Sequence, residues 1–128
     1  MLYEANIRDA WDEIYHGLVE VCEIAGNAMM PEDVYSLCKG GLATLLMAPE
    51  VYGFVVVQLN EDSVTGDRSL FIVAAHSTCG DASKRFQKDL DELAKNHGAS
   101  YIEAMSNRKG MKRLPGWHEI ATVYRRRV

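Results

Sequence analysis

Apolar residues in the first third of the chain recur at steps of three and four positions. This spacing places them along one side of a helix of about sixteen residues that follows Asp9, the expected N-cap. The apolar positions are Trp11, Ile14, Tyr15, Leu18, Val21, Cys22 and Ala25. Four acidic residues fall off this stripe and are expected to face water: Asp12, Glu13, Glu20 and Glu23. A weak alternation over residues 3–8 predicts a short strand before the helix. Pro31 predicts the first turn of a second helix, which ends at Gly40-Gly41.

The middle of the chain instead carries apolar runs of strand length that are rich in valine. Residues 42–48 and 52–59 predict two strands. Residues 69–77 predict a third, whose uninterrupted apolar run is typical of a central strand covered on both faces. Turn-forming residues over 60–68 predict a hairpin between the last two of these strands.

Helix and strand patterns alternate again in the last third of the chain. An amphipathic helix is predicted over residues 82–97, followed by a strand over 100–105, a short basic helix or turn over 107–114 and an alternating strand over 118–126. The order of elements predicts an α/β fold, with one mixed sheet and helices on both of its faces. We expect a single domain spanning residues 1–128.

The composition, 48% apolar and 25% charged, is ordinary for a globular protein. Because no apolar run approaches the ~20 residues of a bilayer span, we expect no membrane partner. The start of the chain lacks the basic-then-apolar pattern of a secretory signal, and the three cysteines form no CxxC pair. These features predict a cytoplasmic protein with reduced thiols and no metal site.

Charge is divided unevenly between the two halves of the chain. Residues 1–64 carry a formal charge of −9 and residues 65–128 carry +5. Such a division is typical of a protein with one acidic and one basic binding face, although solvated helix faces can differ in sign without a partner. The overall pI of about 5.5 argues against a nucleic-acid partner.

The segment from Ser69 to His97 carries the clearest functional signal. A predicted strand passes through a turn containing Gly80 directly into a predicted helix. A helix start presents backbone N–H groups and the positive end of the helix dipole, and this combination favours phosphate. The segment therefore predicts a site for a phosphate-bearing cofactor.

This element order and this turn resemble those of the GCN5-related N-acetyltransferase (GNAT) family. The family signature at the turn is Gln/Arg-x-x-Gly-x-Gly/Ala, and the chain has Ser77-Thr78-Cys79-Gly80-Asp81-Ala82. Gly80 and Ala82 match the signature, whereas Ser77 replaces Gln or Arg. The resemblance implies a GNAT-like fold with a mixed, mostly antiparallel sheet.

The resemblance also implies acetyl-CoA as co-substrate. The turn would hold the pyrophosphate through Cys79, Gly80, Asp81, Ala82, Ser83 and Lys84. The edge of the preceding strand would pair with the pantetheine arm through Ile72, Val73, Ala74 and Ala75, as far as His76. Asp81 is an awkward neighbour for phosphate and alternatively caps the helix.

A second family pattern lies near the end of the chain. Asn107 matches the family asparagine that follows the fifth strand and is assigned to cofactor binding, and Gly116-Trp117 matches a Gly-Phe pair. No tyrosine lies between them, although in many members a tyrosine there protonates the departing thiolate. The basic residues of this segment either meet the 3′-phosphate of CoA or form a solvated turn.

Acetyl transfer to an amine requires a base, because an ammonium group is not a nucleophile. The candidates are His76, Glu103 and Glu61, and His76 is the best placed because it leads into the turn. Alternatively, His76 hydrogen-bonds a loop carbonyl. Cys79 is a further candidate for thiol chemistry, because helix starts lower thiol pKa values.

Two functions follow from these residues and from the resemblance. The first is an acetyl-CoA-dependent N-acyltransferase that acts on a small-molecule or peptide amine. The second is a catalytically silent binding or assembly module, similar to the small, degenerate members of the family that tailed bacteriophages encode. In either case, residues 119–127 could pair across a homodimer.

Overall fold

The computed structural model describes residues 2–26, 28–49, 53–78, 82–105, 116–120 and 124–128. Its elements, in chain order, are β1 (Tyr3–Ala5), α1 (Ile7–Ile24), α2 (Pro31–Lys39), β2 (Thr44–Ala48), β3 (Gly53–Glu61), β4 (Arg68–His76), α3 (Ala82–Asn96) and β5 (Tyr101–Ala104). The strands form one five-stranded sheet in the order β1-β2-β3-β4-β5. Neighbouring strands are antiparallel except for β4 and β5, which are parallel. The predicted fold class, a mixed and mostly antiparallel sheet with helices, is confirmed.

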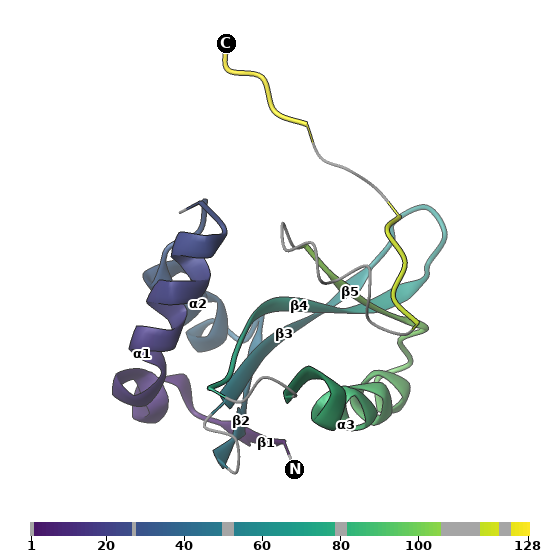
Figure 1. Ribbon diagram of the computed structural model, residues 1–128. Coiled ribbons are helices and arrows are strands. Elements are labelled where there is room, and N and C mark those ends of the chain that lie inside the picture. The colour runs from purple at the N-terminus through teal and green to yellow at the C-terminus, as the bar shows by residue number, and fades with distance from the viewer. Residues whose placement is uncertain (1, 27, 50–52, 79–81, 106–115, 121–123) are drawn as a thin grey trace.

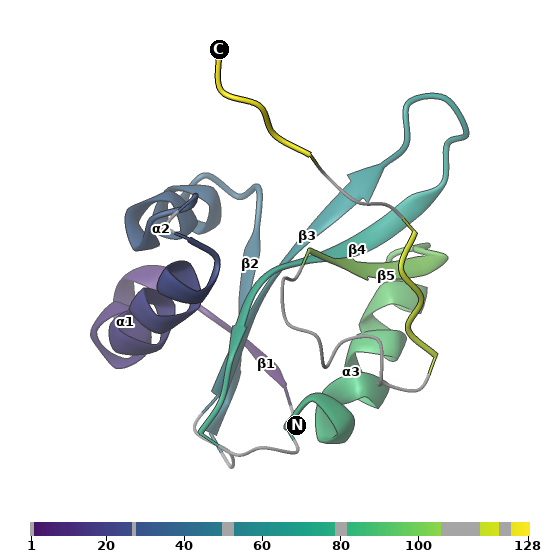
Figure 2. The ribbon, with the colours of Figure 1, turned by 45° about the horizontal axis from the view of Figure 1, so that its top comes forward.

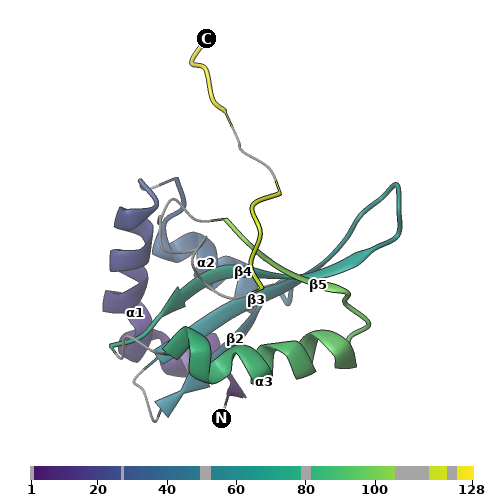
Figure 3. The same cartoon turned by 45° about the vertical axis from the view of Figure 1, so that its right-hand side comes forward.

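Helices cover both faces of the sheet. Figures 1 and 3 show α1 and α2 on one face and α3 on the other. The α1–α2 side buries a cluster that includes Ile14, Leu18, Val34 and Val56. The α3 side buries a second cluster built from Leu46, Val57, Leu70, Leu90 and Ala94. Alternating residues of β2, β3 and β4 supply both clusters, so the sheet forms part of two hydrophobic cores.

Helix α1 begins earlier than the predicted cap at Asp9. The N-cap is Asn6, whose side-chain Oδ1 accepts a hydrogen bond of 2.9 Å from the backbone N–H of Arg8. Asn6 therefore satisfies one of the donors that every helix start leaves unpaired, and the strand β1 ends at Ala5. Pro31 is the first residue of α2, as predicted.

The β3–β4 hairpin extends beyond the rest of the sheet (Figure 2). Its turn is organised by Asp62, whose Oδ1 accepts hydrogen bonds of 2.8 Å from the N–H of Val64 and 2.9 Å from that of Thr65. These bonds hold the pKa of the Asp62 carboxyl below its usual value. The predicted hairpin is therefore present.

The chain after β5 differs from the prediction. The expected helix or turn over 107–114 lies outside the described residues. Of the expected strand over 118–126, the described residues 118–120 and 124–126 form no strand. Ile120 is 80% exposed and Tyr124 is 90% exposed. An alternating pattern forms a strand only where a sheet edge can bury its apolar side, and these two side chains are not buried. Within the described part of the chain, no helix is long and apolar enough to cross a membrane.

Candidate functional site

Strand β4 separates from β5 halfway along its length. The pairing between them covers Ser69 to Ile72 on β4 and Tyr101 to Ala104 on β5. Residues Val73 to His76 run on past the end of β5, as Figure 2 shows. Among the described residues, this half of β4 therefore pairs with β3 on one side and with no strand on the other. This free edge covers residues 73–76 of the edge predicted for the pantetheine arm, whereas Ile72, also predicted, is paired with Ala104 of β5.

A β-bulge lies at the point of separation. Val57 of β3 is opposite Ile72 and Val56 is opposite Ala74, so Val73 is an extra residue in β4. Bulges re-aim side chains and increase local twist. Ile72 packs with the α3-side cluster, whereas Val73 and Ala74 both pack with the α1–α2 cluster. The bulge therefore changes the direction of β4 where its free edge begins.

His76 ends β4 and is held between two elements. Its Nε2 lies 2.6 Å from Oε2 of Glu20 on α1. Its ring stacks on Phe54 of β3, with centroids 5.9 Å apart and an interplanar angle of 22°. A Cβ on Gly17 would lie 2.8 Å from Nδ1 of His76, so the ring packs directly on the backbone of α1. One ring nitrogen thus contacts a carboxylate and the other faces the helix backbone.

This arrangement bears on two expectations. Glu20 is 65% exposed, as expected for a residue off the apolar stripe, and its carboxylate also contacts His76. The alternative in which His76 hydrogen-bonds a loop carbonyl is wrong for Nε2, because Nε2 contacts Glu20. The catalytic role of His76 stays a prediction, and as a base its ring would have to leave the contacts with α1.

Glu103 lies at the other end of the free edge. It is opposite Phe71 of β4, one residue before the end of β5. Leu70 and Ile102 pack on the α3 side. Because residues alternate along a strand, Glu103 faces the side that α1 and α2 cover. Phe71 precedes His76 by five residues, which is roughly 16 Å of extended strand, so the two predicted catalytic residues are not brought together. Glu61 is more distant still, opposite Arg68 at the far end of β4.

The predicted pyrophosphate site is described only in part. Ala82, Ser83 and Lys84 form the first turn of α3. Cys79, Gly80, Asp81 and Asn107 lie outside the described residues, so their predicted roles stay predictions.

The two described thiols are not activated. Burial raises the pKa of the Cys22 thiol, and the carboxylates of Asp33 and Glu32 raise it further. Burial also raises the pKa of Cys38. Both thiols therefore stay protonated and weakly nucleophilic at neutral pH. Within the same described ranges, no group of three or more His, Cys, Asp and Glu side chains could hold a metal ion.

A surface hollow of about 360 Å³ opens elsewhere, between β1, β2, the start of α1 and the end of α2. Arg8 and Lys39, the two basic residues of the first half of the chain, both line it. None of the described residues predicted for cofactor binding or catalysis lines it. The free edge of β4 is therefore a separate feature from this hollow.

Sequence reasoning missed three residues around His76, namely Gly17, Glu20 and Phe54. Gly17 carried a usable signal. A glycine within a helix costs about 1 kcal/mol relative to alanine, so its presence inside a strong helical pattern indicates close packing against another element. The sequence offered no comparable signal for Glu20, which belongs to a row of acidic residues on the same helix.

Comparisons with known proteins identify the fold. No protein-family model and no curated protein sequence matches the chain. Solved structures do match it along its whole length. A ribosomal-protein-alanine N-acetyltransferase from Brucella melitensis biovar Abortus 2308 has a TM-score of 0.71 and 15% identity, over 100% of this chain and 99% of that one.

Two other acetyltransferases match in the same way. One, from Trypanosoma brucei, has a TM-score of 0.61 and 13% identity, over 100% of this chain and 99% of that chain. An aminoglycoside acetyltransferase from an uncultured soil metagenomic sample has a TM-score of 0.62 and 12% identity, over 100% and 98%. The chain therefore has the fold of the GCN5-related N-acetyltransferases, as its element order and turn predicted.

Proposed function

We propose that the protein is an N-acyltransferase that transfers an acetyl group from acetyl-CoA to an amine. The observation that carries this proposal is the free edge of β4 from Val73 to His76, between the bulge and the turn into α3. A strand edge without a partner offers N–H and C=O groups to an extended, amide-containing ligand, as in strand addition. The pantetheine arm of CoA contains two amides and suits such an edge.

The direction of the cofactor follows from the order of these features. The pyrophosphate would bind at Cys79 to Lys84, where the start of α3 favours a negative charge. The arm would then run back along β4 from His76 toward Ile72. Its thioester would lie near the bulge at Val73, where β5 ends at Ala104.

This direction of the cofactor along β4 favours Glu103 as the base. It lies one residue from the end of β5 on the side covered by α1 and α2, and the described residues give it no ion-pair partner. Its carboxylate would accept a proton from the acceptor ammonium, directly or through water. The free amine then forms a C–N bond with the thioester carbonyl carbon, the C–S bond breaks, and CoA leaves as the thiolate. The nitrogen loses its second proton to the departing thiolate or to water, which leaves the neutral amide.

The acceptor is proposed from charge and from the chemistry of the reaction. The −9 charge of residues 1–64 suits a cationic amine, whether a small molecule or a peptide. The matched proteins named above act, by their names, on a ribosomal-protein alanine and on an aminoglycoside. A panel of cationic amines and peptide N-termini therefore tests the acceptor, with release of free CoA thiol as the readout.

Binding of CoA tests the proposal before any acceptor is known. A ligand at one hundred times its Kd stabilises a protein by roughly 2.7 kcal/mol, which corresponds to an increase in Tm of about 10 °C for a domain of this size. We expect millimolar CoA to produce such a shift and Gly80→Arg to abolish it while leaving the unliganded Tm unchanged. No shift with the wild-type protein would overturn the proposal.

Glu103→Gln separates catalysis from binding. It should leave the CoA-induced shift intact and lower the rate of thiol release by roughly 10²- to 10⁴-fold, the range for loss of a general base. Glu61→Gln is the matched control, because Glu61 ends β3 far from the free edge. Equal rates for the Glu103 variant and the control would remove Glu103 from the mechanism.

A second candidate function rests on one sequence observation. No tyrosine lies between Asn107 and Gly116 to protonate the thiolate. A GNAT-fold module that binds CoA or a partner without turnover fits this feature. It predicts no thiol release with any acceptor in the panel.

A further inference from the structure

The contact between Glu20 and His76 joins elements that are far apart in the sequence. The atoms Oε2 and Nε2 lie 2.6 Å apart, within hydrogen-bond distance, across 56 positions of the chain. Glu20 belongs to α1, and His76 is the last residue of β4 before the turn into α3. The contact therefore fastens the end of the free edge to the helix that covers it.

The ring of His76 has little room to move. Phe54 stacks against it from β3, and Gly17 of α1 brings the helix backbone against it. Gly17 and Glu20 are three residues apart and so are neighbours on the surface of α1. The side chain is 22% exposed. Glu20 contacts its Nε2, and a Cβ on Gly17 would lie 2.8 Å from its Nδ1.

The backbone at the end of β4 is crowded as well. A Cβ on Gly53 would lie 3.0 Å from the carbonyl oxygen of His76 and 3.1 Å from Cβ of Ser77. Two glycines from different elements, Gly17 and Gly53, thus both leave room for His76. This convergence shows that α1 and β3 enclose the end of β4 from two directions.

This enclosure supports the half of β4 that carries the free edge. Val73 to His76 are hydrogen-bonded to β3 but extend past β5, so α1 provides the second support for this half of the strand. A binding site whose backbone is held in place before the ligand arrives loses less entropy on binding. Support at His76 fixes the edge and the point at which the chain enters the turn.

We propose that Glu20 is a positioning residue that holds the end of β4, and with it the cofactor-binding edge, through its hydrogen bond to His76. This inference rests on the proposed function as far as CoA is concerned. Glu20 touches no reacting atom in this role. It acts by keeping residues 73 to 77 in one conformation.

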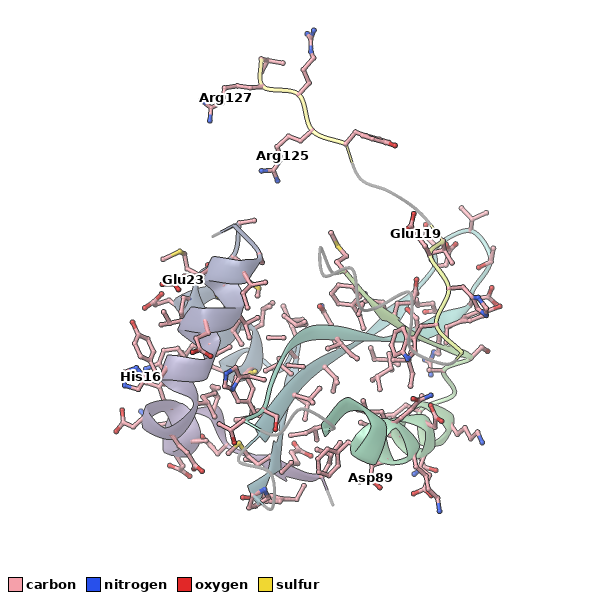
Figure 4. All side chains as sticks on the ribbon, viewed as in Figure 1. His16, Glu23, Asp89, Glu119, Arg125 and Arg127 are labelled. Atoms are coloured by element: carbon pink, nitrogen blue, oxygen red, sulfur yellow. The ribbon has the colours of Figure 1, made fainter. Side chains whose placement is uncertain are left out.

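Three variants test the proposal. Glu20→Ala removes the acceptor, Glu20→Gln keeps an acceptor oxygen without the charge, and Glu23→Ala is the matched control. Glu23 is exposed on the same helix, one turn further along, and Figure 4 shows it on the side of α1 turned away from the sheet. A general effect of removing acidic charge from α1 would appear equally in Glu20→Ala and Glu23→Ala.

The first readout does not depend on CoA. In the unliganded protein, amide hydrogen exchange at residues 73 to 77 should become about tenfold faster in Glu20→Ala. It should stay unchanged in Glu23→Ala and be largely restored in Glu20→Gln. The imidazole ¹⁵N signals of His76 should change in Glu20→Ala and not in the control. Unchanged exchange in Glu20→Ala would overturn the proposal.

The second readout is the Kd of CoA by calorimetry. We expect Glu20→Ala to raise this Kd about tenfold, Glu20→Gln by less than threefold, and Glu23→Ala not at all. Equal CoA affinity in the wild-type protein and Glu20→Ala would overturn the effect on the cofactor edge while leaving the proposed function intact. A wild-type protein that binds no CoA, with faster exchange in Glu20→Ala, would overturn the proposed function while the positioning of β4 by Glu20 stands.

Discussion

At the scale of single residues, most of the chemistry in this chain depends on which partner a side chain finds. Asp62 and Glu20 are both exposed carboxylates, but their partners differ. Asp62 accepts hydrogen bonds from backbone N–H groups two and three residues ahead, which is a local turn. Glu20 contacts a histidine 56 positions away. Only the first kind of partner can be read from neighbouring residues.

Asp62 gives a pH-dependent prediction. Its pKa is lower in the folded protein than in the unfolded chain, because backbone N–H groups of Thr65 and Val64 stabilise the carboxylate. Its contribution to stability is therefore fully present above the unfolded value of 3.8 and is lost as the pH falls through the lower, folded value. Asp62→Asn should lower the urea midpoint at pH 6, and its difference from the wild-type value should shrink as the pH falls below 3.8.

The control for this measurement is Asp67→Asn, the same change of charge in the same loop. A difference between the Asp62 variant and the wild-type protein that stays constant from pH 6 to pH 2.5 would contradict the assignment. A difference that appears equally in the Asp67 variant would assign the effect to loop charge rather than to the turn bonds.

At the scale of elements, the packing of α1 against the end of β4 decides what surrounds the free edge. Helix α1 approaches β4 closely because Gly17 has no side chain. Helix propensity favours alanine at this position by about 1 kcal/mol, whereas packing favours glycine. The two effects act in opposite directions, and a single substitution measures which one is larger.

We expect Gly17→Ala to lower the free energy of unfolding by about 1 to 3 kcal/mol. The added Cβ would lie 2.8 Å from Nδ1 of His76 and 2.9 Å from Cε1 of Phe54, so overpacking outweighs the gain in propensity. In a His76→Ala background the same substitution should be less destabilising, because one of the two clashing rings is gone. Urea unfolding of the four proteins of this cycle measures the coupling. A stabilising effect of Gly17→Ala in the wild-type protein would show that α1 does not approach β4 this closely.

At the scale of the whole molecule, one sheet joins two hydrophobic clusters. Leu18 is fully buried on the α1–α2 side, and Leu90 is buried on the α3 side. Strands β2, β3 and β4 contribute to both clusters, so loss of these strands exposes both clusters together. The C-terminal residues 124–128 are exposed, and Figure 4 shows Arg125 and Arg127 away from the sheet and helices.

This shared sheet predicts one cooperative unfolding transition. Leu18→Ala and Leu90→Ala should each lower the free energy of unfolding by about 2 to 5 kcal/mol. Circular dichroism and tryptophan fluorescence should give the same midpoint in each variant. Two separate midpoints in Leu90→Ala would show that the α3 side unfolds by itself and would contradict the single domain expected over residues 1–128.

The sequence by itself determined the elements. Periodicity, Pro31 and the turn residues around Asp62 are local signals, because they depend on contacts within a few residues of chain. They predicted α1, α2, α3 and the hairpin, and the element order predicted the fold. Local signals were wrong at the start of α1, where the N-cap is Asn6 and not Asp9. They were also wrong after β5, where the apolar side chains of the alternating pattern are not buried against a sheet edge.

Only the tertiary structure decided where β4 leaves β5 and what holds its end. The separation depends on the register between strands about thirty residues apart, and the bulge at Val73 depends on how β3 and β4 divide their side chains between two cores. The contacts of Glu20, Gly17 and Phe54 with His76 require α1 to dock on the finished sheet. Such contacts leave no periodic trace along the chain, because their partners are neighbours in space and not in sequence.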